Sequence, residues 1–375
     1  MDVTVAKKDL LRLVARAQAV ADKKSTMPVL SNVLLEAEGE RLAVKATDLY
    51  LSVSGQIPGE VRRRGSVAVP ARDLLERVKA MPDGPVVVTS ESGTSTVLKA
   101  AGSARRYTLH GVPGTEFPQL PLPKEGAPRL ELPADLLVTL IARTQFSISP
   151  DDTRPNLNSA LFEWVEDRVR MVTTDGHRLS KMEAPLPGNG VKASLLLPLK
   201  AVMELRRLAE DARSEGGVVT LVPSEPNAFF EVAGGLFGVK LVEAQFPSYQ
   251  QVIPQQSSRI AKIPRAAFVD ALRAVSLAAS DRTGGIKLSL SPGTLRISSE
   301  SPESGDGMDE IPMDYAGGEL TIGFNAKYFL DVLSAMDDIE EVALGLSGEL
   351  DPAVLRPAAE AGDRDYVAVV MPMRI

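Results

Sequence analysis

The chain contains three copies of one helical pattern. An apolar residue and a helix-starting Pro or Asn precede a basic residue and further apolar residues at helical spacing in 69-VPARDLLERVKAMP-82, 197-LPLKAVMELRRLAE-210 and 324-FNAKYFLDVLSAMD-337. Arg72, Lys200 and Lys327 begin these copies and are separated by 128 and 127 residues. This period is far longer than that of a solenoid repeat, so we expect a whole domain that recurs three times.

Two further elements recur in the same order around each of these helices. A short strand leads into a second amphipathic helix at 3–21, 132–149 and 263–279. A strand pair with alternating apolar residues follows at 33–48, 160–175 and 286–301, with central turns EGE, VED and SPG that are typical of hairpins. We therefore predict an α+β fold of three similar domains, each with two helices and antiparallel sheet.

Pro-rich stretches separate the three copies, at 113-PGTEFPQLPLPKEGAP-128 and 245-QFPSYQQVIPQQSS-258. We place the domains at 1–125, 126–254 and 255–375. If the three domains join in an arc, their sheets can run on from one to the next and their helices can share one face. Closure by symmetry would then pair the edge strands of the first and last domains.

The composition excludes several kinds of site. The chain has no cysteine, which excludes disulfides and thiolate nucleophiles, and its two histidines argue against a transition-metal site. We expect no metal and no cofactor. The N-terminus does not resemble a signal peptide, and the sequence has no run of about 18 apolar residues. A cytoplasmic protein with no membrane partner is expected.

One of the two histidines lies in 173-TTDGHRLSKM-182. Asp175 and His177 could form a catalytic dyad with Ser180 nearby, although no glycine-framed serine elbow is present. A structural turn with a packing histidine explains the same residues. An enzyme and a scaffold with no role on DNA therefore stay open as function classes from these residues alone.

Several stretches together resemble the β subunit of bacterial DNA polymerase III, the sliding clamp family. They run from end to end in the family's order: 26-TMPVLSNVLLEA-37, 46-ATDLYLSV-53, 69-VPARDLL-75, 144-TQFSIS-149, 173-TTDGHRLS-180, 246-FPSYQQVIP-254, 322-IGFNAKYFLDVL-333 and 369-VVMPMRI-375. The resemblance implies a DNA clamp fold that closes as a head-to-tail homodimeric ring around duplex DNA. It also implies a processivity factor of the replicative polymerase, not an enzyme.

The resemblance implies a wide set of partners. Double-stranded DNA would be encircled without sequence preference, and a second copy of the chain would complete the ring. Short peptide motifs would bring the polymerase α subunit, the clamp loader, translesion polymerases, ligase and mismatch-repair proteins. The chain has no GxxxxGK[ST] phosphate loop, so any ATP-driven loading is expected to be the work of another protein.

The resemblance also carries over a pocket for these peptides. Its positions are Leu157, Thr174, Gly176, His177, Arg178, Leu179, Pro247, Val252, Val369, Met371, Pro372, Met373 and Arg374. Leucine, valine and methionine would form an adaptable apolar floor, and Gly176 would let a peptide backbone approach closely. His177, Arg178 and Arg374 are expected to hydrogen-bond the peptide at the rim. Without the resemblance, the favoured explanation of 369–375 is a last strand that fills a core.

The net charge of −7 means that any surface for DNA must be basic only locally. Candidates on the helices are Arg12, Arg16, Arg72, Arg77, Lys79, Arg143, Lys200, Arg206, Arg207, Arg265 and Arg273, and ordinary solvated helix faces are the alternative. The DNA-contact positions implied by the resemblance are Lys24, Arg72, Arg154 and Asn156. Asp151 and Asp152 in the same loop as Arg154 oppose phosphate binding.

Opposite charges mark two candidate subunit edges. The stretch 102-GSARRYTL-109 resembles an edge strand with Arg105 and Arg106, whereas 300-ESPESGDGMDE-310 is acidic and includes Glu300 and Glu303. Charge complementarity would steer a head-to-tail match between them. A solvated acidic loop is the alternative for the second stretch.

Overall fold

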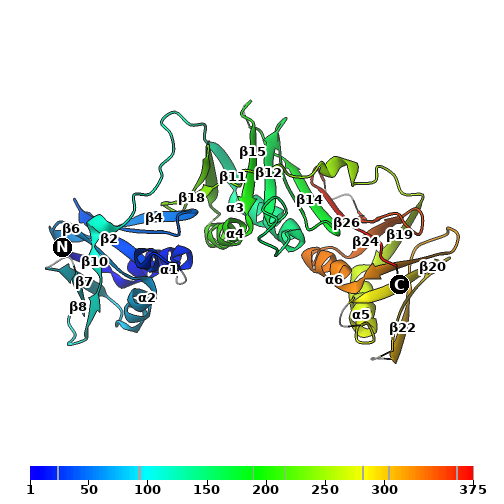
Figure 1. Ribbon diagram of the computed structural model, residues 1–375, viewed down its shortest axis with the longest axis horizontal. Coiled ribbons are helices and arrows are strands. Elements are labelled where there is room, and N and C mark those ends of the chain that lie inside the picture. The colour runs from blue at the N-terminus through cyan, green and yellow to red at the C-terminus, as the bar shows by residue number, and fades with distance from the viewer. Residues whose placement is uncertain are drawn as a thin grey trace. The chain divides into compact units, whose positions relative to one another are not determined.

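The computed structural model describes residues 1–22, 25–91, 94–188, 190–214, 216–280, 283–302, 305–359 and 362–374. The chain divides into two compact units, Met1–Asp135 with Arg207–Leu241, and Leu136–Arg206 with Val242–Ile375. Figure 1 shows helices and strands in both units. Among the described residues, no helix combines the length and the hydropathy needed to cross a membrane.

The first repeat follows the predicted order of elements. It consists of β1 (Asp2–Ala6), α1 (Lys7–Val20), η1 (Pro28–Ser31), β2 (Asn32–Glu38), β3 (Arg41–Thr47), β4 (Leu51–Pro58), β5 (Glu60–Arg63), β6 (Gly65–Pro70), α2 (Ala71–Ala80), β7 (Pro85–Ser90), β8 (Ser95–Ala100), β9 (Arg106–His110), β10 (Val112–Pro113) and η2 (Gly114–Glu116).

The second and third repeats return to the same order. The second consists of β11 (Leu130–Pro133), α3 (Ala134–Thr144), η3 (Gln145–Ser147), β12 (Ser159–Val165), β13 (Arg168–Thr174), β14 (Arg178–Pro185), β15 (Ala193–Pro198), α4 (Leu199–Arg213), β16 (Val218–Ser224), β17 (Asn227–Val232), β18 (Gly235–Lys240) and η4 (Tyr249–Gln251). The third consists of β19 (Arg259–Pro264), α5 (Arg265–Ser276), β20 (Gly285–Ser291), β21 (Thr294–Ser301), β22 (Gly305–Pro312), β23 (Leu320–Asn325), α6 (Ala326–Ala335), β24 (Glu341–Leu346), β25 (Ala353–Pro357) and β26 (Asp365–Val370). The predicted helices and hairpins are therefore confirmed.

Antiparallel sheets join neighbouring repeats within each unit. The first unit has a nine-stranded sheet in the order β10-β6-β2-β3-β4-β18-β17-β16-β11 and a five-stranded sheet in the order β5-β1-β7-β8-β9. The second unit has an eight-stranded sheet in the order β15-β12-β13-β14-β26-β25-β24-β19 and a four-stranded sheet in the order β22-β21-β20-β23. The β4–β18 and β14–β26 pairs join consecutive repeats, so the middle repeat contributes strands to both units. The predicted domain boundaries stay predictions.

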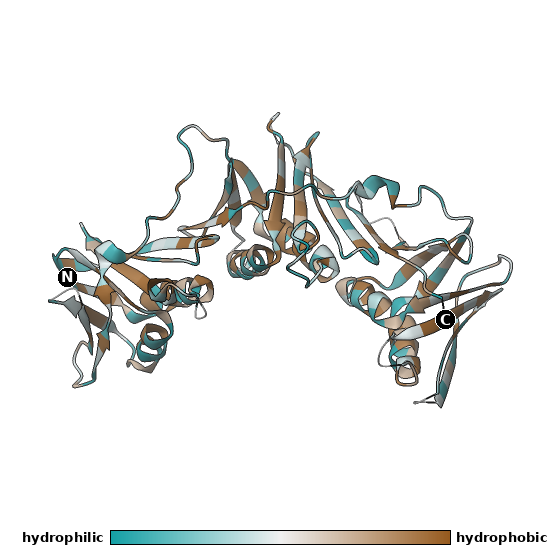
Figure 2. Ribbon diagram, in the orientation of Figure 1, coloured by the Kyte–Doolittle hydropathy of each residue, from teal (hydrophilic) through white to brown (hydrophobic). Residues whose placement is uncertain are grey.

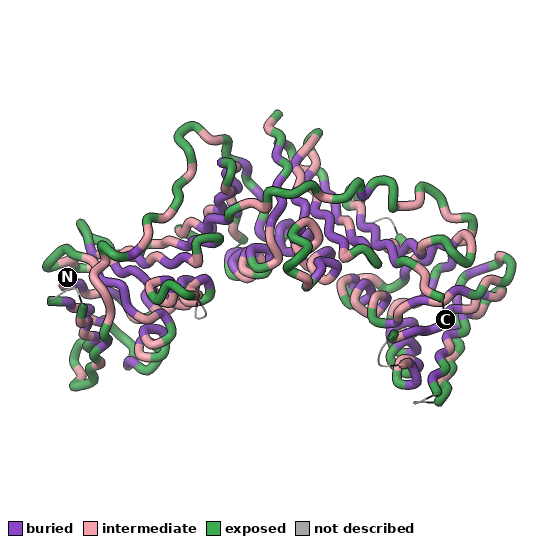
Figure 3. Tube along the Cα trace, viewed as in Figure 1, coloured by how far each residue is buried: buried purple, intermediate pink, exposed green. Residues whose placement is uncertain are grey.

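Apolar residues lie where the helices meet the strands (Figure 2), and the buried parts of the chain follow the strands (Figure 3). In the third repeat, Phe329 of α6 meets Phe324 and Phe268 edge to face, with centroid distances of 5.1 and 5.8 Å. All three rings are fully buried, and each contributes about 1.5–3 kcal/mol to folding. This core holds α6 in place, and α6 carries part of the site described next.

Candidate functional site

The turn from Thr174 to Arg178 joins β13 to β14 and is closed by its own side chains. Thr174 Oγ1 donates to the Arg178 carbonyl at 2.7 Å and accepts from the Gly176 N–H at 3.1 Å. Asp175 Oδ1 accepts from the N–H groups of His177 and Arg178 at 2.9 and 3.0 Å. Gly176 has φ +93°, a region that favours glycine.

The first repeat contains the same turn between β3 and β4. Thr47 Oγ1 donates to the Leu51 carbonyl at 2.7 Å and accepts from the Leu49 N–H at 2.9 Å. Asp48 Oδ1 accepts from the N–H groups of Tyr50 and Leu51 at 2.9 and 2.6 Å. The Thr-Asp pair therefore closes the same turn in the first and second repeats, which supports a structural turn, although His177 is exposed and is not a packing residue.

The catalytic interpretation of this stretch is contradicted. Asp175 bonds the backbone of the turn and the Arg178 side chain, where it cannot serve as the base partner of the His177 imidazole. Ser180 is fully buried, and its hydroxyl lies 2.8 Å from the Ser147 hydroxyl. Neither Asp175 nor Ser180 is therefore placed for nucleophilic chemistry.

Arg178 differs from its predicted role at the rim. Its side chain is only 8% exposed, and each of its three nitrogens donates within the chain: Nε to Asp175 at 3.0 Å, Nη1 to Asp331 at 2.6 Å and Nη2 to the Phe146 carbonyl. The guanidinium also lies 4.7 Å from the Tyr328 ring centroid. A buried guanidinium must satisfy its donors locally, and Arg178 does so within the chain, while its predicted contact with a peptide stays a prediction.

His177 is exposed at the tip of the turn, as a binding residue should be. Its ring stacks on Tyr328 of α6, with a centroid distance of 6.5 Å and an interplanar angle of 16°. Burial, with Asp175 nearby, raises the pKa of the Tyr328 phenol. Tyr328 is absent from the predicted pocket residues, although it lies beside Lys327 in a stretch that carries the resemblance.

Two residues predicted for the apolar floor are buried on neighbouring strands. Leu179 of β14 pairs with Val369 of β26, and both belong to a buried cluster of Leu161, Val172, Leu179, Leu196, Tyr249, Val354, Val367 and Val369. Phe246 and Ile253 pack on this cluster and cover part of it. Pro247 is exposed and the Val252 side chain is 41% exposed, so these two predicted residues lie at the surface of the covering segment.

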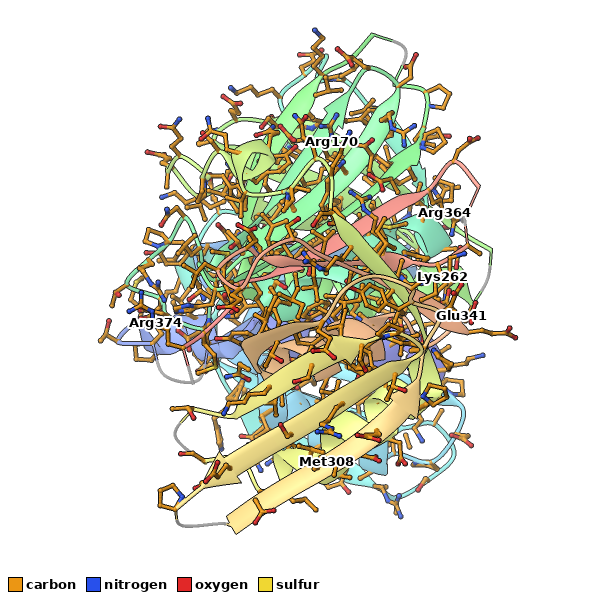
Figure 4. The ribbon with its side chains drawn as sticks, turned by 90° about the vertical axis from the view of Figure 1, so that its right-hand side faces the viewer. Arg170, Lys262, Met308, Glu341, Arg364 and Arg374 are labelled. Carbon is orange, nitrogen blue, oxygen red and sulfur yellow. The ribbon has the colours of Figure 1, made fainter. Side chains whose placement is uncertain are left out.

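The C-terminal segment runs beside the turn. The Met371 N–H donates to the His177 carbonyl at 2.9 Å, and the Met373 N–H donates to the Gly323 carbonyl at 2.9 Å. Met371 is 37% exposed, Pro372 and Met373 are half-buried, and Arg374 is exposed. In Figure 4, Arg374 lies apart from Arg170, Lys262, Glu341 and Arg364 of the same unit.

Leu157 lies in the loop between η3 and β12. Its N–H donates to the Arg154 carbonyl and its carbonyl accepts from the Ser149 N–H, both at 2.9 Å, and its side chain is half-buried. Of the predicted pocket residues, the structure thus brings together the turn from Thr174 to Leu179 and the segment from Val369 to Met373.

A network of ion pairs lies beside the apolar floor on β13, β14 and β26. Arg170 lies 3.0 Å from Glu183, and Lys181 lies 3.3 Å from Asp365. Tyr249 donates to Glu163 at 3.1 Å, and burial raises the pKa of its phenol. Cross-strand ion pairs of this kind satisfy charged groups on a sheet face that is largely covered, since Glu183 is 9% and Tyr249 is 4% exposed.

The predicted DNA contacts differ in their surroundings. Lys24 lies outside the described residues. Arg72 is exposed and its Nε donates to Glu76 at 2.9 Å, whereas Arg154 donates to Asp151 at 2.8 Å. Hydrogen bonds from Thr153 and Arg154 lower the pKa of Asp151, so its charge offsets that of Arg154. Asn156 is half-buried.

Two basic residues proposed to line a DNA channel are buried instead. Arg16 is 5% exposed and lies 3.5 Å from Asp211, and burial lowers its pKa. Arg143 is 8% exposed, donates to the Ala335 carbonyl and Asp338, and lies over the Tyr366 ring. Both assignments to a solvent-facing lining are wrong, because these side chains fix elements within their own units.

The candidate subunit edges are edge strands of their sheets. β9, which begins at Arg106, ends the five-stranded sheet, and β22 ends the four-stranded sheet. Arg105 precedes β9 and donates to the Ala80 carbonyl. Glu300 lies on β21, one strand inside the edge, and its place in a subunit interface stays a prediction, whereas Glu303 lies outside the described residues.

Comparisons with known proteins agree over the whole chain. Family models described as the N-terminal, central and C-terminal domains of the DNA polymerase III beta subunit match residues 1–121, 131–248 and 250–374. The beta sliding clamp of Pseudomonas putida is 34% identical over 380 residues, with complete coverage of both chains. Two solved Pseudomonas aeruginosa sliding clamps, one with a ligand and one bound to griselimycin, are each 32% identical with complete coverage, at TM-scores of 0.92 and 0.91.

Proposed function

The chain belongs to the family of the bacterial DNA polymerase III beta subunit, the beta sliding clamp, and from this premise we propose that the surface around His177 and Met371 is where it holds partner peptides. The chain is a DNA sliding clamp and processivity factor, and it is not an enzyme. It encircles duplex DNA and tethers the replicative polymerase.

One observation carries the proposed site. The bond from the Met371 N–H to the His177 carbonyl joins two segments that lie far apart in the sequence. It places an exposed methionine beside an exposed histidine, above the floor of Leu179 and Val369. A Cβ built on Gly176 meets nothing within 4 Å, which leaves open space for an approaching backbone.

The energetics suit exchange between partners. Burial of two or three apolar peptide side chains contributes about 1.5–3 kcal/mol each. Loss of translational and rotational freedom offsets much of this gain, which leaves binding in the micromolar range. Methionines adapt to different side chains, so one surface can serve several competing partners.

We propose griselimycin as a probe for this site, because a sliding clamp related to this chain has been solved with griselimycin bound. We expect Met371→Ala to weaken griselimycin binding at least about fivefold by isothermal titration calorimetry. The matched control is Met203→Ala, which removes a methionine that is 51% exposed on α4. Equal affinities for the wild type and Met371→Ala would contradict the proposed site.

A second copy of the chain would complete a head-to-tail ring. The edge strand β9 begins with the basic Arg106, and the edge strand β22 carries Asp306, Asp309 and Glu310. Leu277 at the end of α5 is 84% exposed and Met308 on β22 is 59% exposed, as expected of an apolar contact beside an ionic one. Pairing of the two edges would also cover their unpaired backbone groups.

The finer partner set follows from the same proposal. The polymerase α subunit, the clamp loader, translesion polymerases, ligase and mismatch-repair proteins would compete for the surface around His177 and Met371 through short apolar peptides. The clamp would work on DNA in the cytoplasm. Arg72, Arg154 and Asn156 would contact the phosphate backbone weakly enough to permit sliding.

A further inference from the structure

We propose that Asp331 is a positioning residue of the peptide site, which acts through Arg178 and touches no peptide itself. Asp331 lies on α6, in the third repeat, whereas Arg178 begins β14, in the second repeat. The proposal rests on the proposed function, because it explains what holds that site in shape.

The Arg178 guanidinium ties together three elements around the site. Nε bonds Asp175 in the turn, Nη1 bonds Asp331 on α6, and Nη2 bonds the Phe146 carbonyl in η3. The aromatic rings of Tyr328 and Phe146 lie 4.7 and 5.4 Å from the guanidinium carbon. A planar group with forked donors fixes the orientation of its partners better than a single point charge does.

Asp331 links this guanidinium to the exposed residues. It lies three residues after Tyr328 on α6, so the two side chains share one face of the helix. Tyr328 stacks on His177, and the His177 carbonyl holds Met371. If the bond from Arg178 to Asp331 is removed, α6 loses its ionic link to the turn, and the stack of His177 on Tyr328 loses its fixed geometry.

The acidic residue at the equivalent position of the first repeat, Glu76, has a different set of partners. Glu76 of α2 occupies the position of Asp331, four residues after Arg72 as Asp331 is four residues after Lys327. Both acids bond these basic residues, at 2.9 and 2.7 Å. The Asp331 carboxylate, 26% exposed, also accepts from Arg178, whereas the Glu76 carboxylate is 58% exposed. Glu76 therefore provides a matched control.

The test compares Asp331→Asn with Glu76→Gln in the full-length chain. Griselimycin affinity is measured by calorimetry, and the melting temperature is measured on the same samples. We expect Asp331→Asn to bind griselimycin about tenfold more weakly. The His177 and Tyr328 side chains would still be present, but they would no longer be held in the geometry that binds the ligand. Glu76→Gln should bind as the wild type does.

A spectroscopic signature separates positioning from general stability. The chain has two histidines, His110 and His177, so its imidazole protons give two sets of signals by NMR. Asp331→Asn should shift the His177 signal and leave the His110 signal in place. Asp331→Glu keeps the carboxylate and should recover most of the affinity, as a conservative rescue.

Three outcomes would overturn the proposal. One is Asp331→Asn with unchanged affinity and an unchanged His177 signal. Another is a loss of griselimycin affinity in Glu76→Gln that is as large as the loss in Asp331→Asn. If Asp331→Asn folds poorly, the proposal is tested with Asp331→Glu and Arg178→Lys instead. A folded Arg178→Lys variant that binds griselimycin with full affinity would then contradict the proposal. Failure of the proposed function itself would look different: Met371→Ala would bind griselimycin normally while Asp331→Asn still moved the His177 signal.

Discussion

Leu49 and Gly176 occupy the same position in two copies of one turn, with φ +74° and +93°. The backbone of this turn requires the left-handed region whichever residue stands there, because the Thr and Asp side chains bond the same N–H groups in both copies. Leucine in this region is strained, and its side chain is 52% exposed, so little burial offsets the strain.

Exchanging these residues tests the strain directly. Gly176→Ala should lower the free energy of unfolding by about 1 kcal/mol, because the added Cβ meets no atom and only the backbone conformation is penalised. Leu49→Gly should change it by less than about 1 kcal/mol, with relief of strain opposed by the added chain entropy. Urea denaturation measures both, and a Gly176→Ala variant as stable as the wild type would show that the turn tolerates a side chain.

The ion pair of Asp151 with Arg154 predicts a gain in DNA binding when the acid is removed. Asp151→Asn frees Arg154 for a phosphate, which should add up to about one unit to the salt dependence of duplex binding. Asp152→Asn makes the same change in net charge without releasing Arg154 and is the control. Salt titrations that give the same slope for both variants would remove Arg154 from the DNA surface.

Charge reversal on β9 should weaken the homodimer. Arg106→Glu places an acid opposite the acidic strand β22, so we expect the dimer dissociation constant to rise at least about tenfold in analytical ultracentrifugation. Asp309→Arg in the same chain should restore much of the affinity. Arg62→Glu on β5, at the opposite edge of the same sheet, is the control. An unchanged Arg106→Glu dimer would place the interface elsewhere.

Tyr249 predicts a loss of stability at alkaline pH. Burial raises the pKa of its phenol above the ordinary value of 10.0, so its contribution is present below about pH 10 and is lost as the pH rises through the folded-state pKa. Unfolding free energies between about pH 9 and about pH 11 should fall more steeply for the wild type than for Tyr249→Phe. Tyr50→Phe, which alters a ring that is 66% exposed, should keep the wild-type slope, and parallel curves for all three proteins would refute the assignment.

The sequence was sufficient for the fold because its signals are local and occur three times. Helical spacing after Arg72, Lys200 and Lys327 located α2, α4 and α6, and the spacing at 3–21, 132–149 and 263–279 located α1, α3 and α5 to within a few residues. The VED turn shows the limit of local signals, because Glu166 and Asp167 adopt φ +54° and +56° without any glycine. The register of β12 against β13 is set by the pattern of the two strands and not by the residues of the turn.

The site was less predictable because burial depends on contacts between distant segments. Arg178 looks like an exposed donor in TDGHRL, yet Phe146 and Asp331 enclose it from elements 32 and 153 residues away. Arg16 and Arg143 lie on helices whose apolar spacing says nothing about a partner acid such as Asp211 or Asp338. Tyr328 was missed for a related reason, since an aromatic residue on an amphipathic helix is usually part of the core.

Retention on DNA is the most direct test of the central claim, that this chain is a clamp held on DNA by topology. The protein is loaded onto a nicked circular plasmid with a clamp loader and ATP and is gel-filtered at moderately high salt, before and after the plasmid is linearised. The account predicts that the protein elutes with the circle and is lost from the linear form. Loss from both forms, or retention on both, would contradict it.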